Sequence, residues 1–226
     1  MVILIVGVLM AIATTNFMPR TEKARFEATV AEMQAITYAI AGNPDLHHDG
    51  ARSDFGYVGD IGALPINLDA LVSNPGLGTW DGPYIDGDFD SDGYKKDAWN
   101  SYYIYTDTLL RSNGSGSNID KLIALSSNAL TDNNVEGIVH DAKIQPPGTH
   151  NSSLCARLIY PNGSGGMADD SSGIRADGSF RFSNIPIGNH ILKIIYTPDS
   201  DTITQTVGIT PGRDSKLDIV FPADLW

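Results

Sequence analysis

The chain has 226 residues and a formal net charge of −12 at pH 7, with 15 Lys and Arg against 27 Asp and Glu. So few cations argue against a nucleic-acid partner, which would need Lys and Arg to neutralise its phosphates. The single cysteine, Cys155, excludes an intrachain disulfide. It lies in an apolar run, which predicts a small buried side chain.

An apolar run opens the chain and continues without a strong break into an amphipathic segment. Residues 1–13 would be apolar on every side of a helix, so they need lipid or copies of themselves around them. From residue 22 to 41 one apolar stripe recurs at helical spacing. It consists of Phe26, Val30, Met33, Ile36 and Ile40. We therefore predict one long helix whose second half packs onto a globular head.

The apolar run has three interpretations. A secretory signal would show a basic leader and a cleavage site, but no Lys or Arg precedes this run and the helical pattern carries straight on. A plain membrane span needs roughly 20 apolar residues, which is more than the run supplies. The third interpretation is a helix that is first inserted in the membrane and is then extracted into a bundle of identical helices.

The residues themselves favour the third interpretation. Residues 7–33, GVLMAIATTNFMPRTEKARFEATVAEM, closely resemble the N-terminal helix of type IV pilins, and above all that of the major pseudopilins of type II secretion. The resemblance implies a helical homopolymer, with inner-membrane assembly machinery as a partner before polymerisation. The candidate assembly residues are Val2, Leu4, Val6, Gly7, Leu9, Ile12 and Pro19.

The chain departs from that family at its start. Family members begin with a basic leader, a cleavage glycine and a Phe-Thr-Leu-x-Glu start, and none of these is present. We expect that the sequence lacks its first residues, or that this is a divergent member. The helix proline expected at Thr15 has moved to Pro19, so residues 7–19 are where we expect the helix to kink or melt. Gly42 and Pro44 should then stop it.

Residues 44–144 are expected to form the head. Three stretches, residues 59–75, 80–85 and 95–105, resemble the head of major pseudopilins. Residues 102–105 and 121–125 predict two strands on either side of a Gly/Ser/Asn-rich turn. A small antiparallel sheet laid across the helix stripe would bury Phe26, Val30 and Met33.

The sharpest local motif in the head is acidic. Residues 88–93, DFDSDG, repeat the D-x-D-x-D-G opening of a calcium loop, in which alternating carboxylates converge on one cation. The closing glutamate is missing, since Trp99 stands there. A solvated acidic loop is the alternative. The resemblance also implies a structural calcium in the head, and the candidate ligands are Asp86, Asp88, Asp90, Asp92 and Asp97.

A Pro/Gly/Ser/Asn-rich linker at residues 145–152 precedes a different pattern. Apolar runs at residues 154–160, 179–182, 190–197, 203–209 and 216–221 alternate with turn clusters, which predicts a small β-sandwich over 153–226. Residues 174–195, with DGSFRFSNIPIG, resemble the carboxypeptidase regulatory-like, or transthyretin-like, module. That resemblance implies a noncatalytic domain.

The sequence gives little support for an enzymatic function. The sequence has no G-x-S-x-G elbow, P-loop, GxGxxG or HExxH. Three sequons, at Asn113, Asn151 and Asn162, make glycans a candidate partner.

Together these features predict an α+β fold, in which a long N-terminal helix (1–43) packs on a small antiparallel sheet and an all-β sandwich domain follows. The predicted function is a structural subunit of an extracellular type IV pilus-like filament. The alternative is a pseudopilin of a type II secretion system.

Overall fold

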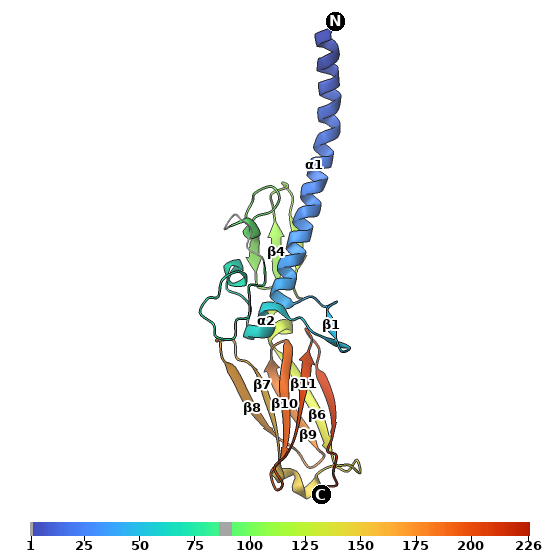
Figure 1. Cartoon of the computed structure of the whole chain (residues 1–226), viewed down its shortest axis with the longest axis vertical. Coiled ribbons are helices and arrows are strands. Elements are labelled where there is room, and N and C mark those ends of the chain that lie inside the picture. The colour runs from blue at the N-terminus through green and yellow to red at the C-terminus, as the bar shows by residue number, and fades with distance from the viewer. Residues whose placement is uncertain (1, 86–91) are drawn as a thin grey trace.

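The computed structural model describes the backbone of residues 2–85 and 92–226, with side chains described from residue 20 onward within those ranges. Helix α1 (Val2–Ala41) stands at one end, a small head lies beside its lower half, and a β-sandwich forms the other end (Figure 1). The N-terminus and the C-terminus lie at opposite ends of this long molecule (Figure 1).

Two sheets form the sandwich. The four-stranded sheet has the order β11-β10-β7-β8, and the three-stranded sheet has the order β12-β6-β9. The strands are β6 (Asn133–His140), β7 (Leu154–Pro161), β8 (Met167–Gly173), β9 (Ser179–Ile185), β10 (Gly188–Tyr196), β11 (Asp201–Ile209) and β12 (Ser215–Val220). All of their pairings are antiparallel except the parallel pair β12–β6.

The alternation of side chains explains why these strands form. Successive strand residues face opposite sides of a sheet, and in β10 Leu192, Ile194 and Tyr196 are buried while their neighbours are more exposed. Together with Phe180 and Val139 they belong to one apolar core between the two sheets. Cys155 is only partly buried, because it occupies an outward position of β7.

Strand β6 comes from a segment that the sequence placed in the head. The sandwich was expected to start at residue 153, after a linker at 145–152, yet β6 pairs with β12 and β9 inside it. The expected linker contains a short 3-10 helix, η3 (Gly148–Ser153), and Asn151 Nδ2 donates to Ile174 O at 3.1 Å. The sandwich therefore begins with Asn133.

The predicted α+β class is wrong, because the fold is mainly β-sandwich and only 23% of the chain is helical. The head also covers less of the apolar stripe of α1 than the sequence predicted. Met33, Ile36 and Ile40 are buried, but Phe26 and Val30 are 48% and 39% exposed. The physical reason is that the head sheet is too small to span the stripe, since its strands β3 (Ile104–Thr106), β4 (Leu109–Ser112) and β5 (Ile119–Leu122) are three or four residues long.

Other parts of the head cover the helix instead. The core around Ile36 and Ile40 is completed by Tyr57, Val58 and Ile61 of α2 (Gly56–Ile61). The remaining short elements are β1 (His47–His48), β2 (Ala51–Arg52), η1 (Leu68–Leu71), η2 (Gly93–Lys95) and α3 (Ser127–Thr131). The head is thus built mainly from turns and short helices around the lower half of α1.

Helix α1 is one continuous element, without the break that was expected between Gly7 and Pro19. It ends where Gly42 was predicted to stop it. Gly42 has φ 78°, and a Cβ there would lie 2.3 Å from Asp54 O, so only glycine fits.

The head and the sandwich meet in a close junction. Ile187, between β9 and β10, is fully buried in the head core, and its N–H donates to Leu130 O at 2.9 Å. Gly163, which follows β7, donates its N–H to Ile61 O at 2.8 Å. The sandwich therefore supplies part of the core of the head.

Candidate functional site

The candidate site for assembly is helix α1, and the structure gives its two halves different surroundings. The half up to Pro19 extends away from every other described element (Figure 1). All the candidate assembly residues belong to this half: Val2, Leu4, Val6, Gly7, Leu9, Ile12 and Pro19. Their side chains lie outside the described part of the structure, so their predicted contacts with other copies stay a prediction.

The lower half of α1 is fixed to the head by hydrogen bonds spread along its length. Trp99 Nε1 donates to Glu22 Oε2 at 2.8 Å, and Ala98 N donates to Thr29 Oγ1 at 3.1 Å. Further down, Lys121 Nζ donates to Gln34 Oε1. Because Thr29 is fully buried, its hydroxyl is a specific anchor rather than a solvated surface group.

Tyr103 makes a further contact with the helix, from a buried ring to a glutamate on α1. It is 8% exposed, and its hydroxyl donates to Glu32 Oε2 at 2.7 Å. Burial, together with this hydrogen bond to a carboxylate, raises the pKa of Tyr103 well above its usual range. The phenol therefore stays protonated and keeps donating to the helix.

Arg52 fixes the end of the helix. Its Nη2 donates to Ala41 O at 2.6 Å and to Gly42 O at 3.0 Å, and its guanidinium carbon lies 4.6 Å from the centre of the Phe55 ring. Burial lowers the pKa of Arg52 somewhat, but a cation at the carbonyl end of a helix is favourable. Both ends of the lower half are thus tied to the head.

Within the residues whose side chains are described, no helix is long and apolar enough to cross a membrane. Phe26 and Val30 remain as half-exposed apolar side chains at the margin of the helix–head contact.

The predicted calcium ligands Asp86, Asp88 and Asp90 lie outside the described residues. Asp92 is described, and Lys95 Nζ lies 3.0 Å from its Oδ1. Hydrogen bonding to that ammonium lowers the pKa of Asp92. Over residues 2–85 and 92–226 no group of three or more Asp, Glu, His or Cys is placed to hold a metal. The calcium proposal therefore depends on the undescribed loop.

The fifth candidate ligand, Asp97, is a structural carboxylate in the part that is described. It is 4% exposed, and its Oδ1 accepts from the N–H groups of Trp99 and Ser101, both at 2.9 Å. Its Oδ2 accepts from Ser112 Oγ at 2.5 Å and from Gly114 N at 3.1 Å. These four bonds join the turn before β3 to the end of β4. The sequence analysis missed this role, although an Asp that opens a turn is a common signal of it.

The three sequon asparagines differ in their surroundings. Asn113 is exposed in the turn between β4 and β5. Asn162 is also exposed, but its Oδ1 accepts from Ser164 N at 2.9 Å and organises a turn. Asn151 is partly buried, and its amide nitrogen already donates to Ile174 O, so less of this side chain is open to a glycan. Asn113 and Asn162 are the two exposed candidates.

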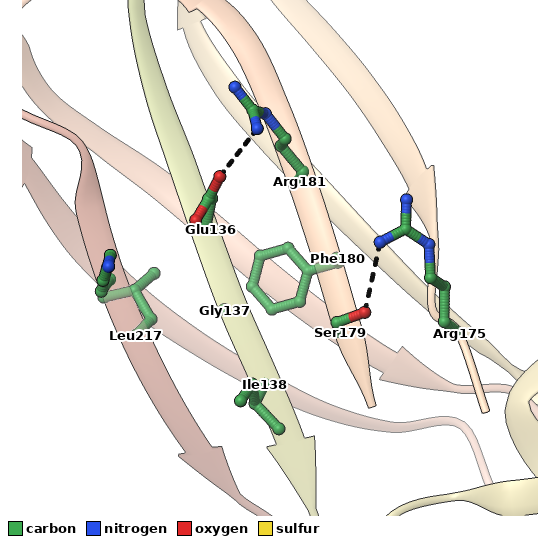
Figure 2. A pocket seen from close by; sticks show the side chains of 9 residues that line it. Glu136, Gly137, Ile138, Arg175, Ser179, Phe180, Arg181 and Leu217 are labelled. Atoms are coloured by element: carbon green, nitrogen blue, oxygen red, sulfur yellow. Dashed lines mark hydrogen bonds and ion pairs between the residues drawn. The ribbon is translucent and has the colours of Figure 1, made fainter. Parts of the chain in front are cut away.

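A shallow groove on the outer face of the three-stranded sheet was not anticipated from the sequence (Figure 2). It has a volume of about 440 Å³. Its charged and polar lining comes from three strands and the turn before β9, which is why no local motif revealed it. The outward side chains are Glu136, Ile138, Arg175, Ser179, Arg181 and Lys216.

No protein-family model and no curated protein matches the sequence. Among solved structures, the dioxygenase domain of a dioxygenase carbohydrate-binding protein fusion from Streptomyces sp. SirexAA-E is 16% identical, with a TM-score of 0.32 over 45% of this chain and 86% of that one. The major pilin subunit of Bacillus cereus is 17% identical, with a TM-score of 0.28 over 52% and 39%. The Bacillus anthracis TIE protein is 14% identical, with a TM-score of 0.33 over 46% and 19%. Similarities this weak assign neither a family nor an activity to the chain.

Proposed function

We propose that the chain is a noncatalytic structural subunit that polymerises through α1 into an extracellular type IV pilus-like filament. The observation that carries the proposal is the division of α1 into a half that is fixed to the head and a half that extends beyond every other described element (Figure 1). A helix this apolar needs lipid or other helices around it. Identical helices from neighbouring copies would supply that environment.

The arrangement of the elements supports a layered filament. Because α1 and the C-terminus lie at opposite ends of the molecule, a bundle of α1 helices would place the heads around it and the sandwiches outermost (Figure 1). The rigid attachment of the lower half of α1, through Glu22, Thr29 and Glu32, would transmit the position of each helix to its head.

Burial of the apolar half among neighbouring helices would supply the free energy of assembly. Each large apolar side chain removed from water contributes about 1.5 to 3 kcal/mol before entropy costs. Before polymerisation the same residues would rest in the inner membrane, where assembly machinery would extract them.

Replacing one apolar residue by a charged one tests this directly. Leu9→Asp should abolish filaments while the head stays folded, because an aspartate would be buried among apolar helices without a partner. Leu125→Asp is the matched control, since Leu125 is 94% exposed on the head. Filament yield is measured by electron microscopy of material sheared from cells, and head folding by the thermal melting of purified protein. Normal filaments from Leu9→Asp would refute the proposal.

The alternative is a pseudopilin of a type II secretion system, a periplasmic fibre that acts as a piston. It is favoured by residues 80–85, WDGPYI, which resemble the pseudopilin head. The appended sandwich favours surface display instead, since a piston has little use for an outer domain. Long sheared filaments containing this chain would support the first function. Their absence, together with loss of protein secretion in a deletion strain, would support the second.

A further inference from the structure

Strand β11 forms a free edge of the four-stranded sheet. Among the described strands it pairs only with β10, and this pairing runs from Asp201 to Ile209 without a bulge. The N–H and C=O groups on such an edge are a template for pairing with another chain, and proteins usually block it with charged side chains, proline, bulges or short strands. β11 has nine residues, and none of these blocking features lies between Thr202 and Ile209.

The other edges of the sandwich are protected. β8 carries Asp169 and Asp170 near its middle. β12 has only six residues, and two of them are Lys216 and Asp218. β9 carries Arg181, and its pairing with β6 contains a register shift. Among the described edge strands of the sandwich, β11 is therefore the one best suited to pair with another strand.

The backbone groups of alternate residues in β11 point to the free edge. Gly208 O accepts from Ser215 Oγ at 3.2 Å. Because Ser215 begins β12 in the other sheet, this carbonyl points away from β10. Residues two apart in a strand direct their N–H and C=O groups to the same side. Thr202, Thr204 and Thr206 therefore present their backbone groups at the free edge, and over the described residues these groups have no hydrogen-bond partner in the protein.

The pairing of β10 leads to the same assignment. The N–H of Thr197, directly after β10, donates to Ser153 O, directly before β7, at 2.8 Å. The odd-numbered residues of β10 thus face β7 and its even-numbered residues face β11. Leu192, an even-numbered residue, stands in register with Gln205. The odd-numbered residues of β11 therefore bond to β10, which leaves the even-numbered residues for the edge.

A second copy of β11 matches this edge. When the two strands lie antiparallel with Thr204 opposite Thr204 of the second copy, Thr202 faces Thr206. Each of the three residues then donates one backbone N–H and accepts one. Their side chains are exposed on the outer face of the sheet, where threonine pairs across antiparallel strands are favourable. The edge is thus complementary to itself.

Charges do not oppose this pairing. Asp201 falls opposite the apolar Val207 of the second copy. The cation beside the central threonine is Lys193, which stands in register with Thr204 on β10. The two copies of Lys193 are separated by three strand spacings, about 14 Å. That distance exceeds the Debye length of about 8 Å at physiological ionic strength, so their repulsion is largely screened.

We propose that β11 is an interaction surface for a second copy of this chain, whose own β11 pairs with it antiparallel and extends the four-stranded sheet across both copies. The contact is two-fold symmetric and closes as a pair, whereas copies within one helical polymer are joined head to tail. In the proposed filament the β11 contact therefore joins two filaments side by side at their outer sandwiches. Only this last consequence rests on the proposed function.

The test is disulfide cross-linking of the full-length chain in detergent, with Cys155→Ser as the background. In Thr204→Cys the two thiols lie at the two-fold axis, where paired Cα atoms are about 5.5 Å apart and a disulfide fits. Oxidised glutathione should convert this variant to a covalent dimer on a non-reducing gel. Ser171→Cys, exposed on β8 at the opposite edge of the same sheet, is the matched control and should remain monomeric.

A second pair of variants tests the backbone pairing itself. In the Thr204→Cys background, Thr206→Pro removes an N–H that faces the second copy but no bond to β10, and proline is tolerated at such edge positions. It should lower the yield of covalent dimer about tenfold or more, because the symmetric contact loses two hydrogen bonds. Thr206→Val keeps the N–H and should leave the yield unchanged. Melting curves check that each variant remains folded.

The proposal is overturned if Thr204→Cys gives no covalent dimer, if Ser171→Cys gives as much, or if Thr206→Pro and Thr206→Val give equal yields. Because the chain is cross-linked in detergent, the result does not depend on polymerisation. A chain that forms no filaments but gives the expected dimer would refute the proposed function and leave the β11 contact in place.

Discussion

Removing the carboxylate of Asp97 should strongly destabilise the head. In Asp97→Ala, three backbone N–H groups and the Ser112 hydroxyl lose their acceptor. An unsatisfied buried donor costs about 1 to 3 kcal/mol. Three of the four donors belong to partly exposed residues, so the lower figure applies and the sum is about 4 kcal/mol. For a protein of this size that loss lowers the melting temperature by about 8 to 16 °C.

Thermal melting followed by tryptophan fluorescence measures the effect, because Trp99 lies within the turn that Asp97 organises. Asp120→Ala is the control, since Asp120 pairs with Arg111 on the exposed face of the small sheet. It should change the melting temperature little. The structural role of Asp97 predicts the same loss with and without calcium. Equal melting of Asp97→Ala and Asp120→Ala would show that the four hydrogen bonds do not stabilise the head.

Three further predictions concern other parts of the fold. Ile187→Ala should destabilise the head by about 2 to 5 kcal/mol through a cavity in its core, whereas Ile191→Ala, at a position 43% exposed, should have little effect; urea unfolding measures both. If the acidic loop binds calcium, a calcium concentration of 100 times Kd should raise the free energy of unfolding by about 2.7 kcal/mol. Asp88→Ala should then remove the difference between melting curves in calcium and in chelator. His190 is buried, and desolvation lowers its pKa. At mildly acidic pH its imidazole is therefore protonated in the unfolded chain but neutral in the folded chain. Stability should therefore fall as the pH drops below about 6.5, and His190→Gln should reduce that dependence in urea unfolding at pH 7.5 and 5.5.

Much of the sandwich could be predicted because its core strands alternate. The five predicted apolar runs coincide with β7, β9, β10, β11 and β12. Strand β8, MADDSSG, was missed because it is a polar edge strand without an apolar pattern. Strand β6 was missed for a different reason. Its burial alternates, but its inward positions include Asn133 and Gly137, and it precedes the Pro/Gly-rich segment that was taken for the domain boundary.

The helix stripe shows where periodicity stops being informative. Spacing identified Met33, Ile36 and Ile40 correctly as buried, yet the same spacing extended the stripe to Phe26 and Val30. Periodicity gives the direction of an apolar face, but not the length of the surface that covers it. That length was set by α2 and by a sheet of very short strands, neither of which the helix sequence encodes.

The candidate sites also differ in whether their residues are close together in the sequence. Asp97 belongs to a local turn, so its role could have been found from the residues that follow it. The groove could not, because Glu136, Arg181 and Lys216 are distant in the sequence and become neighbours only through strand pairing.

The position of Ile187 has a consequence for the order in which the molecule is completed. The core of the head is lined by residues from α1 and α2, yet one of its fully buried side chains arrives from between β9 and β10. During synthesis the head therefore cannot close until the segment between β9 and β10 has been made. A product that stops before Ile187 would have an open head. Proteases that attack open heads would then remove products that stop before Ile187.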